Sequence, residues 1–146
     1  IVNTIHVRAE AKLDPHPMPA CRAMTSVAYF KAHNETIDRQ QRRFAPGTLV
    51  SGTKKDVVIT PRLASYPGRV AIYGWLRPGG EAIQPLSTVH EARYADYSHG
   101  IRLVSSTVLV DGEARSVFDV LEDPSQAGLL SDEGPDPNAR RLLGPS

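Results

Sequence analysis

The feature that most constrains the fold is a change of hydrophobic period at Pro46-Gly47. Before it, from Ala20 to about Arg43, apolar residues recur at three- and four-residue steps, as on one face of an α-helix. After it, the chain consists of short β-branched and aromatic runs that Pro and Gly separate. A lone helix cannot bury its apolar face, so it must pack on these strands. The period change therefore predicts an α+β domain.

The helical segment, about residues 20–43, has clear end signals. Thr25 or Ser26 can cap its start, and its basic last turns suit the negative end of the helix dipole. Its apolar series consists of Ala23, Val27, Phe30, Ile37 and Phe44. Asn34 falls in the same series, so we expect its amide to face inward, to pin the helix to the sheet or to orient a catalytic group.

The strands are expected to pair mostly antiparallel, as one sheet or a partly closed barrel of five to seven strands. Two turn signals support this, Pro78-Gly79-Gly80 and Asp111-Gly112, since both are typical of hairpins. The expected strands cover residues 1–7, 48–51, 56–60, 69–75, 81–86, 100–110 and 114–120. Lys54-Lys55-Asp56, at the entrance of one strand, predicts a solvated turn.

The length of 146 residues suits a single domain. Residues 14–19 (DPHPMP) predict an extended loop, and the polar, Pro- and Gly-rich residues 123–146 predict an extended surface tail. Because residue 1 is Ile and no signal-peptide pattern follows, we expect a processed product or an excised portion of a longer protein. The single cysteine, Cys21, excludes an internal disulfide, and a small buried residue is the expected role rather than a nucleophile.

The charge balance argues against two classes of partner. Seventeen Lys and Arg face sixteen Asp and Glu, so no basic excess predicts nucleic-acid or anionic-membrane binding. No apolar run approaches the roughly 20 residues that a membrane helix needs. We therefore expect neither nucleic acid nor membrane as a partner.

Polar and aromatic residues concentrate between residues 73 and 102. The set comprises Tyr73, Trp75, Gln84, His90, Glu91, Arg93, Tyr94, Asp96, Tyr97, Ser98, His99 and Arg102. Rings that accompany titratable groups are typical of binding sites, because they give contact area at little cost in side-chain entropy. This density predicts a functional site.

The centre of that region is the string from Asp96 to Arg102. If it is extended, Ser98 and His99 point to opposite faces and cannot act together as nucleophile and base. A Ser98 nucleophile would then need His90 or the distant His33 as its base.

Four residues are the predicted catalytic set. His99 is the general acid or base, Asp96 orients it or shares a proton, and His90 is the second imidazole. Ser98 is a nucleophile or a hydrogen-bond donor. Gly100 would let a substrate approach the backbone closely.

Four more residues are the predicted substrate contacts. Arg102 would bind an anionic group, and Tyr73, Trp75 and Tyr97 would form the substrate wall. A purely structural interpretation stays open, in which Arg102 forms an ion pair with Glu91 or Asp96 and the rings are half-buried core residues.

No cofactor is predicted. His90, Asp96 and His99 are ligand types that zinc or iron accepts, but their spacing matches no compact metal signature. The metal prediction is accordingly none.

Several stretches resemble a family of uncharacterised, exported bacterial proteins that carry a DYSHGIRLV motif. They are FKAHNETIDRQ, GTKKDVVIT, GRVAIYGWLRPGGEAIQPL, ARYADYSHGIRLV, the VDG turn and LLSDEGP, within about residues 30–135. The resemblance implies a secreted or extracellular location. It also implies that this chain is a carboxy-terminal portion, whose site an amino-terminal segment or companion chain completes. In several relatives the position of Leu76 is a histidine, which this chain lacks.

A second resemblance is weaker. Ser98-His99-Gly100 is similar to the Ser-His-Gly-Cys-x-Arg motif of L,D-transpeptidase catalytic domains, but Ile101 follows where the nucleophilic cysteine would stand. The departure removes the cross-linking chemistry.

These observations predict a hydrolase that acts on an extracellular polymer such as a cell-wall glycan or peptide, with lyase chemistry left open. The alternative is a non-catalytic carbohydrate- or peptide-binding module that uses the same aromatic and Arg residues. A third interpretation is a structural exported protein, whose polar cluster is a hydrogen-bonded network.

Overall fold

A computed structural model describes residues 1–100 and 102–143 of the chain. Its helices are α1 (Val2–Arg8), α2 (Val27–Gln41), α3 (Val117–Glu122) and α4 (Ala139–Leu143), with short 3₁₀ turns η1 (Arg22–Thr25), η2 (Pro61–Ser65) and η3 (Ala127–Leu129). Its strands are β1 (Ala11–Lys12), β2 (Val50–Ser51), β3 (Lys55–Val58), β4 (Arg69–Leu76), β5 (Ala82–Glu91), β6 (Thr107–Val110) and β7 (Glu113–Ser116). The predicted α+β class is confirmed.

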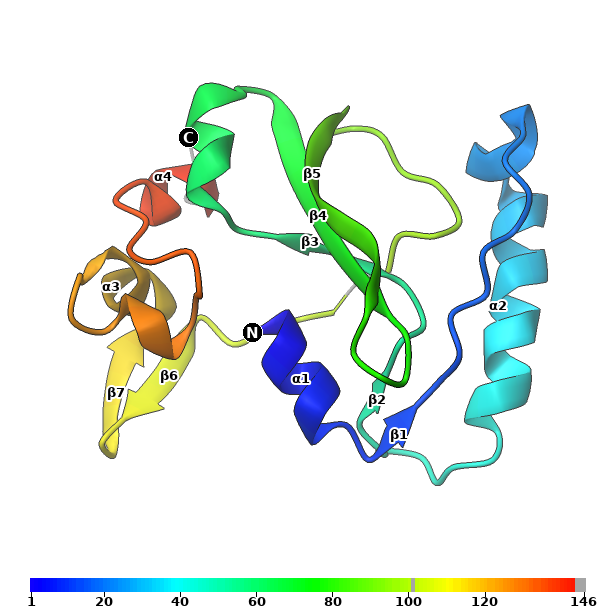
Figure 1. Cartoon of the computed structure of the whole chain (residues 1–146), viewed down its shortest axis with the longest axis horizontal. Helices are drawn as coiled ribbons and strands as arrows, with labels where there is room; N and C mark the ends of the chain where they lie inside the picture. Colours follow the sequence, from blue (N-terminus) through cyan, green and yellow to red (C-terminus); the bar gives the residue numbers. More distant parts are fainter. Residues whose placement is uncertain (101, 144–146) are drawn as a thin grey trace.

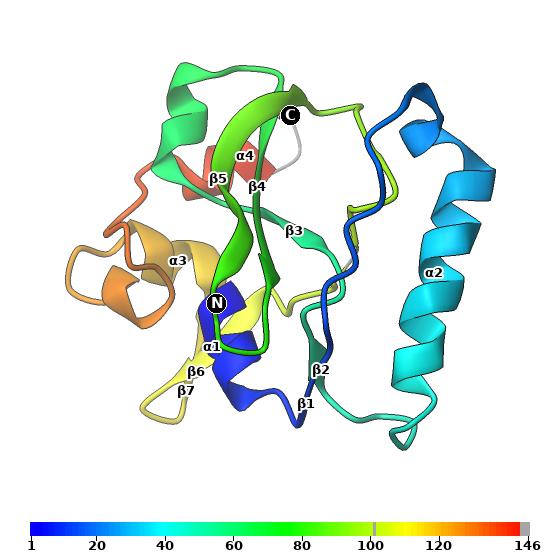
Figure 2. The same cartoon turned by 45° about the vertical axis from the view of Figure 1, so that its right-hand side comes forward.

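The strands form three small sheets. β3, β4 and β5 make an antiparallel sheet in that order, β6 and β7 make an antiparallel hairpin, and β1 pairs with β2 in parallel. Among the described residues no sheet closes into a barrel, and α2 is the longest of four helices rather than the sole one. Figures 1 and 2 show α2 on one side of the three-stranded sheet, with α1, α3 and the β6–β7 hairpin toward the other.

Helix α2 is shorter than predicted, and its buried face contains Ile37, as expected, but His33 in place of Asn34. It starts at Val27 because the Ser26 side chain accepts a hydrogen bond from the backbone N–H of Tyr29. His33 and Ile37 are its buried residues, whereas Asn34 is exposed. The expectation that Asn34 faces inward is therefore wrong. His33 and Ile37, four residues apart, lie on the face of α2 that packs against the rest of the domain.

Three segments differ from the predicted strands. Residues 2–8 form helix α1, whose buried residue is His6. The predicted strand 114–120 ends at Ser116, which caps α3 by accepting from the N–H of Phe118. Of the predicted strand 100–110, the described residues form a strand only at β6, and residue 101 lies outside the described residues.

The predicted surface tail is only partly extended. Within residues 123–143 the chain forms η3 and α4, and Ala127, Asp136 and Ala139 are buried. Ala139 packs with Val117 and Leu121 in a small apolar cluster. This part of the tail therefore contributes to a core; residues 144–146 lie outside the described residues.

Both predicted hairpin turns are present. β4 and β5 flank the Pro78-Gly79-Gly80 turn, and β6 and β7 flank Asp111-Gly112. Asp111 and Gly112 have φ of 52° and 87°, the conformation that matches the twist of a two-residue hairpin.

Alternation along β3 separates two sides of the central sheet. Lys55 pairs with Gly74 and Asp56 with Tyr73, and adjacent strand residues point to opposite faces. Lys55 lies over the Trp75 ring on the α2 side, while Asp56 lines a cavity on the α1 and α3 side. This alternation places Lys55 and Asp56 on opposite sides of the sheet.

Candidate functional site

Five side chains gather on the α2 side of the sheet, and we call them the imidazole cluster: His90, Tyr94, Asp96, His99 and Lys55. The rings of His90 and Tyr94 stack with centroids 4.5 Å apart and planes 2° apart. The His99 ring meets His90 edge-on, with centroids 5.5 Å apart. Backbone bonds from Lys55 N–H to the Ser98 carbonyl and from Gly100 N–H to the Lys55 carbonyl join the loop to β3.

Residues 96–99 form a tight turn rather than the extended strand that we expected. The Ser98 backbone N–H and hydroxyl both donate to Asp96 Oδ1, at 2.8 and 2.5 Å. The Asp96 N–H donates to His99 Nδ1 at 2.9 Å. A short acidic side chain that bonds the backbone two residues ahead favours a turn over a strand ladder. The alternation argument for Ser98 and His99 therefore does not apply.

Asp96 is the fixed anion of the imidazole cluster. Its side chain is 2% exposed and accepts from Ser98 and from the Tyr94 hydroxyl, the latter at 3.1 Å. Burial opposes its ionisation most strongly, but the hydrogen bonds from Ser98 and the charges of His99 and Lys55 together hold the Asp96 pKa below its usual value. Asp96 is therefore a carboxylate at neutral pH, and the Ser98 hydroxyl is committed to it as a hydrogen-bond donor.

Both imidazoles are neutral near pH 7. Burial lowers the His99 pKa, and Lys55 and His90 add to this against the opposing charge of Asp96. Burial and the Lys55 charge likewise lower the His90 pKa. A neutral imidazole can accept or donate a proton, which is the state that acid–base catalysis needs.

Hydrogen bonding gives the two imidazoles different capacities. Because His99 Nδ1 accepts from the Asp96 N–H, neutral His99 carries its proton on Nε2. That Nε2 is buried and has no hydrogen-bond partner among the described residues. His99 is thus arranged to donate from Nε2, which leaves the partly exposed His90 as the group to accept a proton.

Trp75 and Tyr97 are buried aromatic residues next to the imidazole cluster. They are 4% and 3% exposed, with ring centroids 6.2 Å apart, and Lys55 Nζ lies 5.6 Å from the Trp75 ring. The Tyr97 hydroxyl donates to the Met18 carbonyl and accepts from the Met18 N–H. The expectation that both rings form a substrate wall is not supported, because neither offers a face to solvent.

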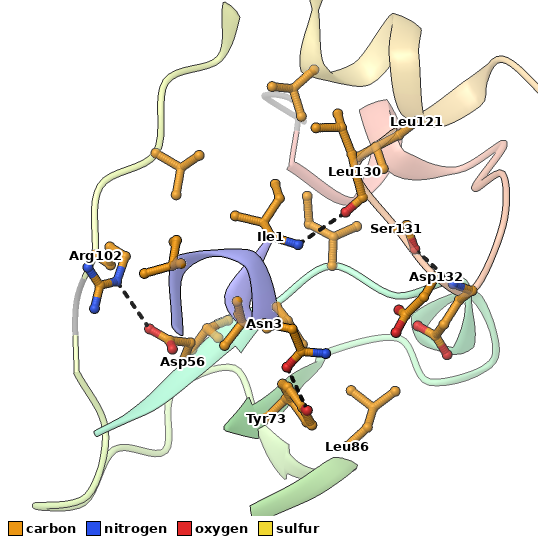
Figure 3. Close-up of a pocket in the computed structure, with 18 of the residues that line it drawn as sticks. Ile1, Asn3, Asp56, Tyr73, Leu86, Arg102, Leu121, Leu130, Ser131 and Asp132 are labelled. Atoms are coloured by element: carbon orange, nitrogen blue, oxygen red, sulfur yellow. Dashed lines mark hydrogen bonds and ion pairs between the residues drawn. The ribbon is translucent and has the colours of Figure 1, made fainter. Parts of the chain in front are cut away.

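Tyr73 and Arg102 lie apart from the imidazole cluster, with Asp56. Figure 3 shows Arg102 beside Asp56, with Nε 4.0 Å from Oδ1, and the Tyr73 hydroxyl donating to Asn3 Oδ1 at 2.8 Å. Asp56, rather than Glu91 or Asp96, is therefore the carboxylate nearest Arg102. The structure brings together His90, His99, Asp96 and Ser98, and leaves Tyr73 and Arg102 outside this group. Arg102 and Asp56 line both the cavity beside α1 and α3 and a smaller one beside α2.

Sequence reasoning missed the roles of four residues. Lys55 and Asp56, expected in a solvated turn, instead belong to opposite faces of β3. A Cβ at Gly100 would lie 2.7 Å from Lys54 Cβ, so this glycine accommodates Lys54 rather than a substrate. Cys21 is exposed rather than buried. For Lys55 the available signal was its place as the first residue of a β-branched strand.

In residues 1–100 and 102–143, no three His, Cys, Asp or Glu side chains are grouped so that they could hold a metal ion. Over the same part of the chain, no helix has the length and apolar character that crossing a membrane requires.

Comparison of the chain with protein-family models, with curated proteins and with solved structures gives no match.

Proposed function

We propose that this chain is a hydrolase of an extracellular polymer, and that it cleaves an acyl bond in a cell-wall peptide. The observation that carries the proposal is the pairing of two neutral imidazoles with different hydrogen-bonding capacities beside a fixed carboxylate and a lysine. The extracellular substrate rests on the resemblance to exported proteins through the DYSHGIRLV motif.

The choice of peptide over glycan rests on the carboxylate. Glycosidases use two carboxyl groups that can reach the scissile bond. Asp96 is the carboxylate of the imidazole cluster, and it is buried and bonded by Ser98 and Tyr94. Imidazoles suit water attack on a carbonyl, in which one proton must be removed and later returned.

In the proposed reaction, His90 accepts a proton from water as its oxygen attacks the carbonyl carbon. The negative charge that develops on the carbonyl oxygen is met by the Lys55 ammonium and by the His99 Nε2–H. Because that nitrogen is buried in the free chain, the proposal requires that substrate binding uncovers it. When the carbon–nitrogen bond breaks, protonated His90 returns the proton to the leaving amine. A neutral imidazole that donates to such an oxygen is an established role for histidine.

Asp96 and Ser98 act as positioning residues in this scheme. The Asp96 backbone N–H sets the His99 tautomer, and Ser98 fixes the Asp96 side chain. The predicted nucleophilic role of Ser98 is not part of the proposal, because its hydroxyl is buried and already donated.

The test is product release from purified cell walls, muropeptides and a panel of glycans, followed by mass spectrometry. We expect peptide products that have gained one water with the wild-type chain and none with His90→Gln or His99→Gln. His16→Gln, which changes an exposed histidine outside the imidazole cluster, is the matched control. Circular dichroism should show all variants folded. Wild-type products that persist in both cluster variants would contradict the proposal.

The pH profile separates a catalytic role from a structural one. Activity should fall on the acid side as His90 gains a proton, with a midpoint below the ordinary histidine pKa because burial and Lys55 lower it. His90→Gln would leave any residual activity without that acid limb.

The second candidate is the carbohydrate- or peptide-binding module. The observation in its favour is that Tyr73 and Arg102 lie together, away from the imidazoles. Retention of both wild type and His90→Gln on one polymer, without products, would favour it over the hydrolase.

A further inference from the structure

A cavity of about 550 Å³ lies on the side of the central sheet opposite the imidazole cluster. Its walls come from α1, β3, α3 and the segments at residues 102–106 and 130–133. Figure 3 shows these segments surrounding it. The volume is within the range of small-molecule sites, about 300–1,000 Å³. The imidazole cluster contributes no side chain to it.

The body of the cavity is apolar. Side chains of Val58, Ile59, Val117, Leu121 and Leu130 line it. An elongated hydrocarbon group would exchange water contact for contact with these side chains, which is favourable in proportion to the area removed from water.

The cavity is polar in two places. On one side Arg62 and Glu133 form an ion pair at 3.2 Å, whereas the groups on the side of Asp56 and Arg102 are incompletely paired. Arg102 Nε lies 4.0 Å from Asp56 Oδ1, which is too long for a hydrogen bond. Among the described residues none donates a hydrogen bond to the Asp56 carboxylate, while Arg102 donates to the Val50 carbonyl at 3.2 Å. Burial raises the Asp56 pKa, against the opposing charge of Arg102, as expected for a carboxylate that lacks donors.

We infer that this cavity binds an uncharged amphipathic ligand whose apolar body fills the cavity and whose head both donates to Asp56 and accepts from Arg102. A carboxamide and a vicinal diol share this chemistry. The inference is independent of the proposed hydrolase, since it concerns other residues and predicts binding without turnover.

Charge selects the head group. An anionic head would gain from Arg102 but meet the Asp56 carboxylate, and a cationic head would have the reverse conflict. An uncharged head that offers a donor and an acceptor side by side satisfies both groups at once. A partly buried carboxylate without a donor, such as Asp56, is costly, so a ligand that donates to it gains affinity as well as orientation.

The experiment compares four ligands with one eight-carbon chain: octanamide, 1,2-octanediol, octanoate and octylamine. Binding to the full chain is measured by isothermal titration calorimetry below the micelle-forming concentrations, and by ¹⁵N NMR shifts. We expect the amide and the diol to bind at least tenfold more tightly than the acid and the amine. Comparison of octanamide with 1,2-octanediol then shows whether the cavity prefers an amide or a hydroxylated head group.

Two neighbouring substitutions locate the site. Val104→Trp should abolish binding, because Val104 lines the cavity and is 56% exposed, so a larger ring can enter without disturbing the core. Leu103→Trp is the matched control, because Leu103 is 93% exposed and does not line the cavity. Asp56→Asn should raise octanoate affinity several-fold by removing a like charge.

Three results would overturn the inference. They are the absence of binding by both uncharged ligands, equal binding of all four, and equal loss of binding in the two Trp variants. None of them requires a hydrolytic assay, so the cavity and the hydrolase can fail separately.

Discussion

Protonation of His33 should make the domain acid-sensitive. His33 is 0% exposed on the inner face of α2, with its ring 5.0 Å from Tyr97 and 6.2 Å from Trp75. Neither ring nitrogen has a hydrogen-bond partner among the described residues. Burial, with the charge of Lys54 adding to it, lowers the His33 pKa from 6.5 to about 4.

The size of the effect follows from that difference. The unfolded chain takes up the proton near pH 6.5, but the folded chain takes it up only near pH 4. The stability that neutral His33 contributes is therefore fully present above pH 6.5, and it is lost as the pH falls from 6.5 to about 4. Each tenfold change in the proton affinity of His33 is worth about 1.4 kcal/mol. The free energy of unfolding should therefore fall by about 3 kcal/mol between pH 7 and pH 4 because of this one group.

The assay is urea unfolding at pH 7 and pH 4, followed by the fluorescence of Trp75, the single tryptophan. His33→Phe keeps a ring but cannot titrate, so it should lose about 3 kcal/mol less than wild type over this range. Asn34→Gln, an exposed change on the next position of α2, should behave as wild type. His33→Leu repeats the test if the larger ring does not pack. A non-titrating variant that loses as much stability as wild type would refute the reasoning.

Three further predictions concern stability. Ser98→Ala should cost about 1–3 kcal/mol in urea unfolding, because Asp96 loses a buried donor, and should raise the Asp96 pKa in NMR titration. Gly52→Ala should lower the unfolding free energy by more than about 2 kcal/mol, because φ is +96° and a Cβ would lie 2.2 Å from a backbone oxygen. Gly47→Ala has φ +91° but nothing within 4 Å, so it should cost distinctly less, and equal losses would contradict the steric account. Arg140→Ala should change stability by less than about 1 kcal/mol, since its ion pairs are half-exposed, and a larger loss in the same assay would contradict this.

Local turn chemistry was predictable from the sequence, and the orientation of the main helix was not. The Asp111-Gly112 hairpin and the Ser26 cap depend on neighbouring residues alone, and both are present. The buried face of α2 depends on which side chains the sheet offers. His33 docks against Trp75 and Tyr97, so Asn34 turns to solvent although the apolar series contains it.

Two short helices, α1 and α3, stand where the sequence predicted strands. A seven-residue segment such as α1 fits strand alternation and helical spacing equally well, so the sequence alone could not decide between them. For α3 a usable signal existed. Ser116 precedes Val117, Val120 and Leu121, which have the one-, four- and five-residue offsets of a capped helix with one buried face.

The predicted site residues are close in sequence, but the geometry of the folded chain separates them. Clustering in sequence between residues 73 and 102 favoured one site, but neighbours on β3 go to opposite sides of the sheet. Alternation along β4 would place Tyr73 and Trp75 on one side, but the strand is irregular there, with a register shift against β5 and a φ of 54° at Trp75. Lys55 joins the imidazoles while Asp56, the next residue, pairs with Arg102. The turn at Asp96, in contrast, brings Ser98 and His99 to the same carboxylate. The polar region is therefore divided between the imidazole cluster, where we propose acid–base chemistry, and the cavity at Asp56 and Arg102, where we propose ligand binding. Substitutions at Lys55 and Asp56 should affect the two proposed sites independently.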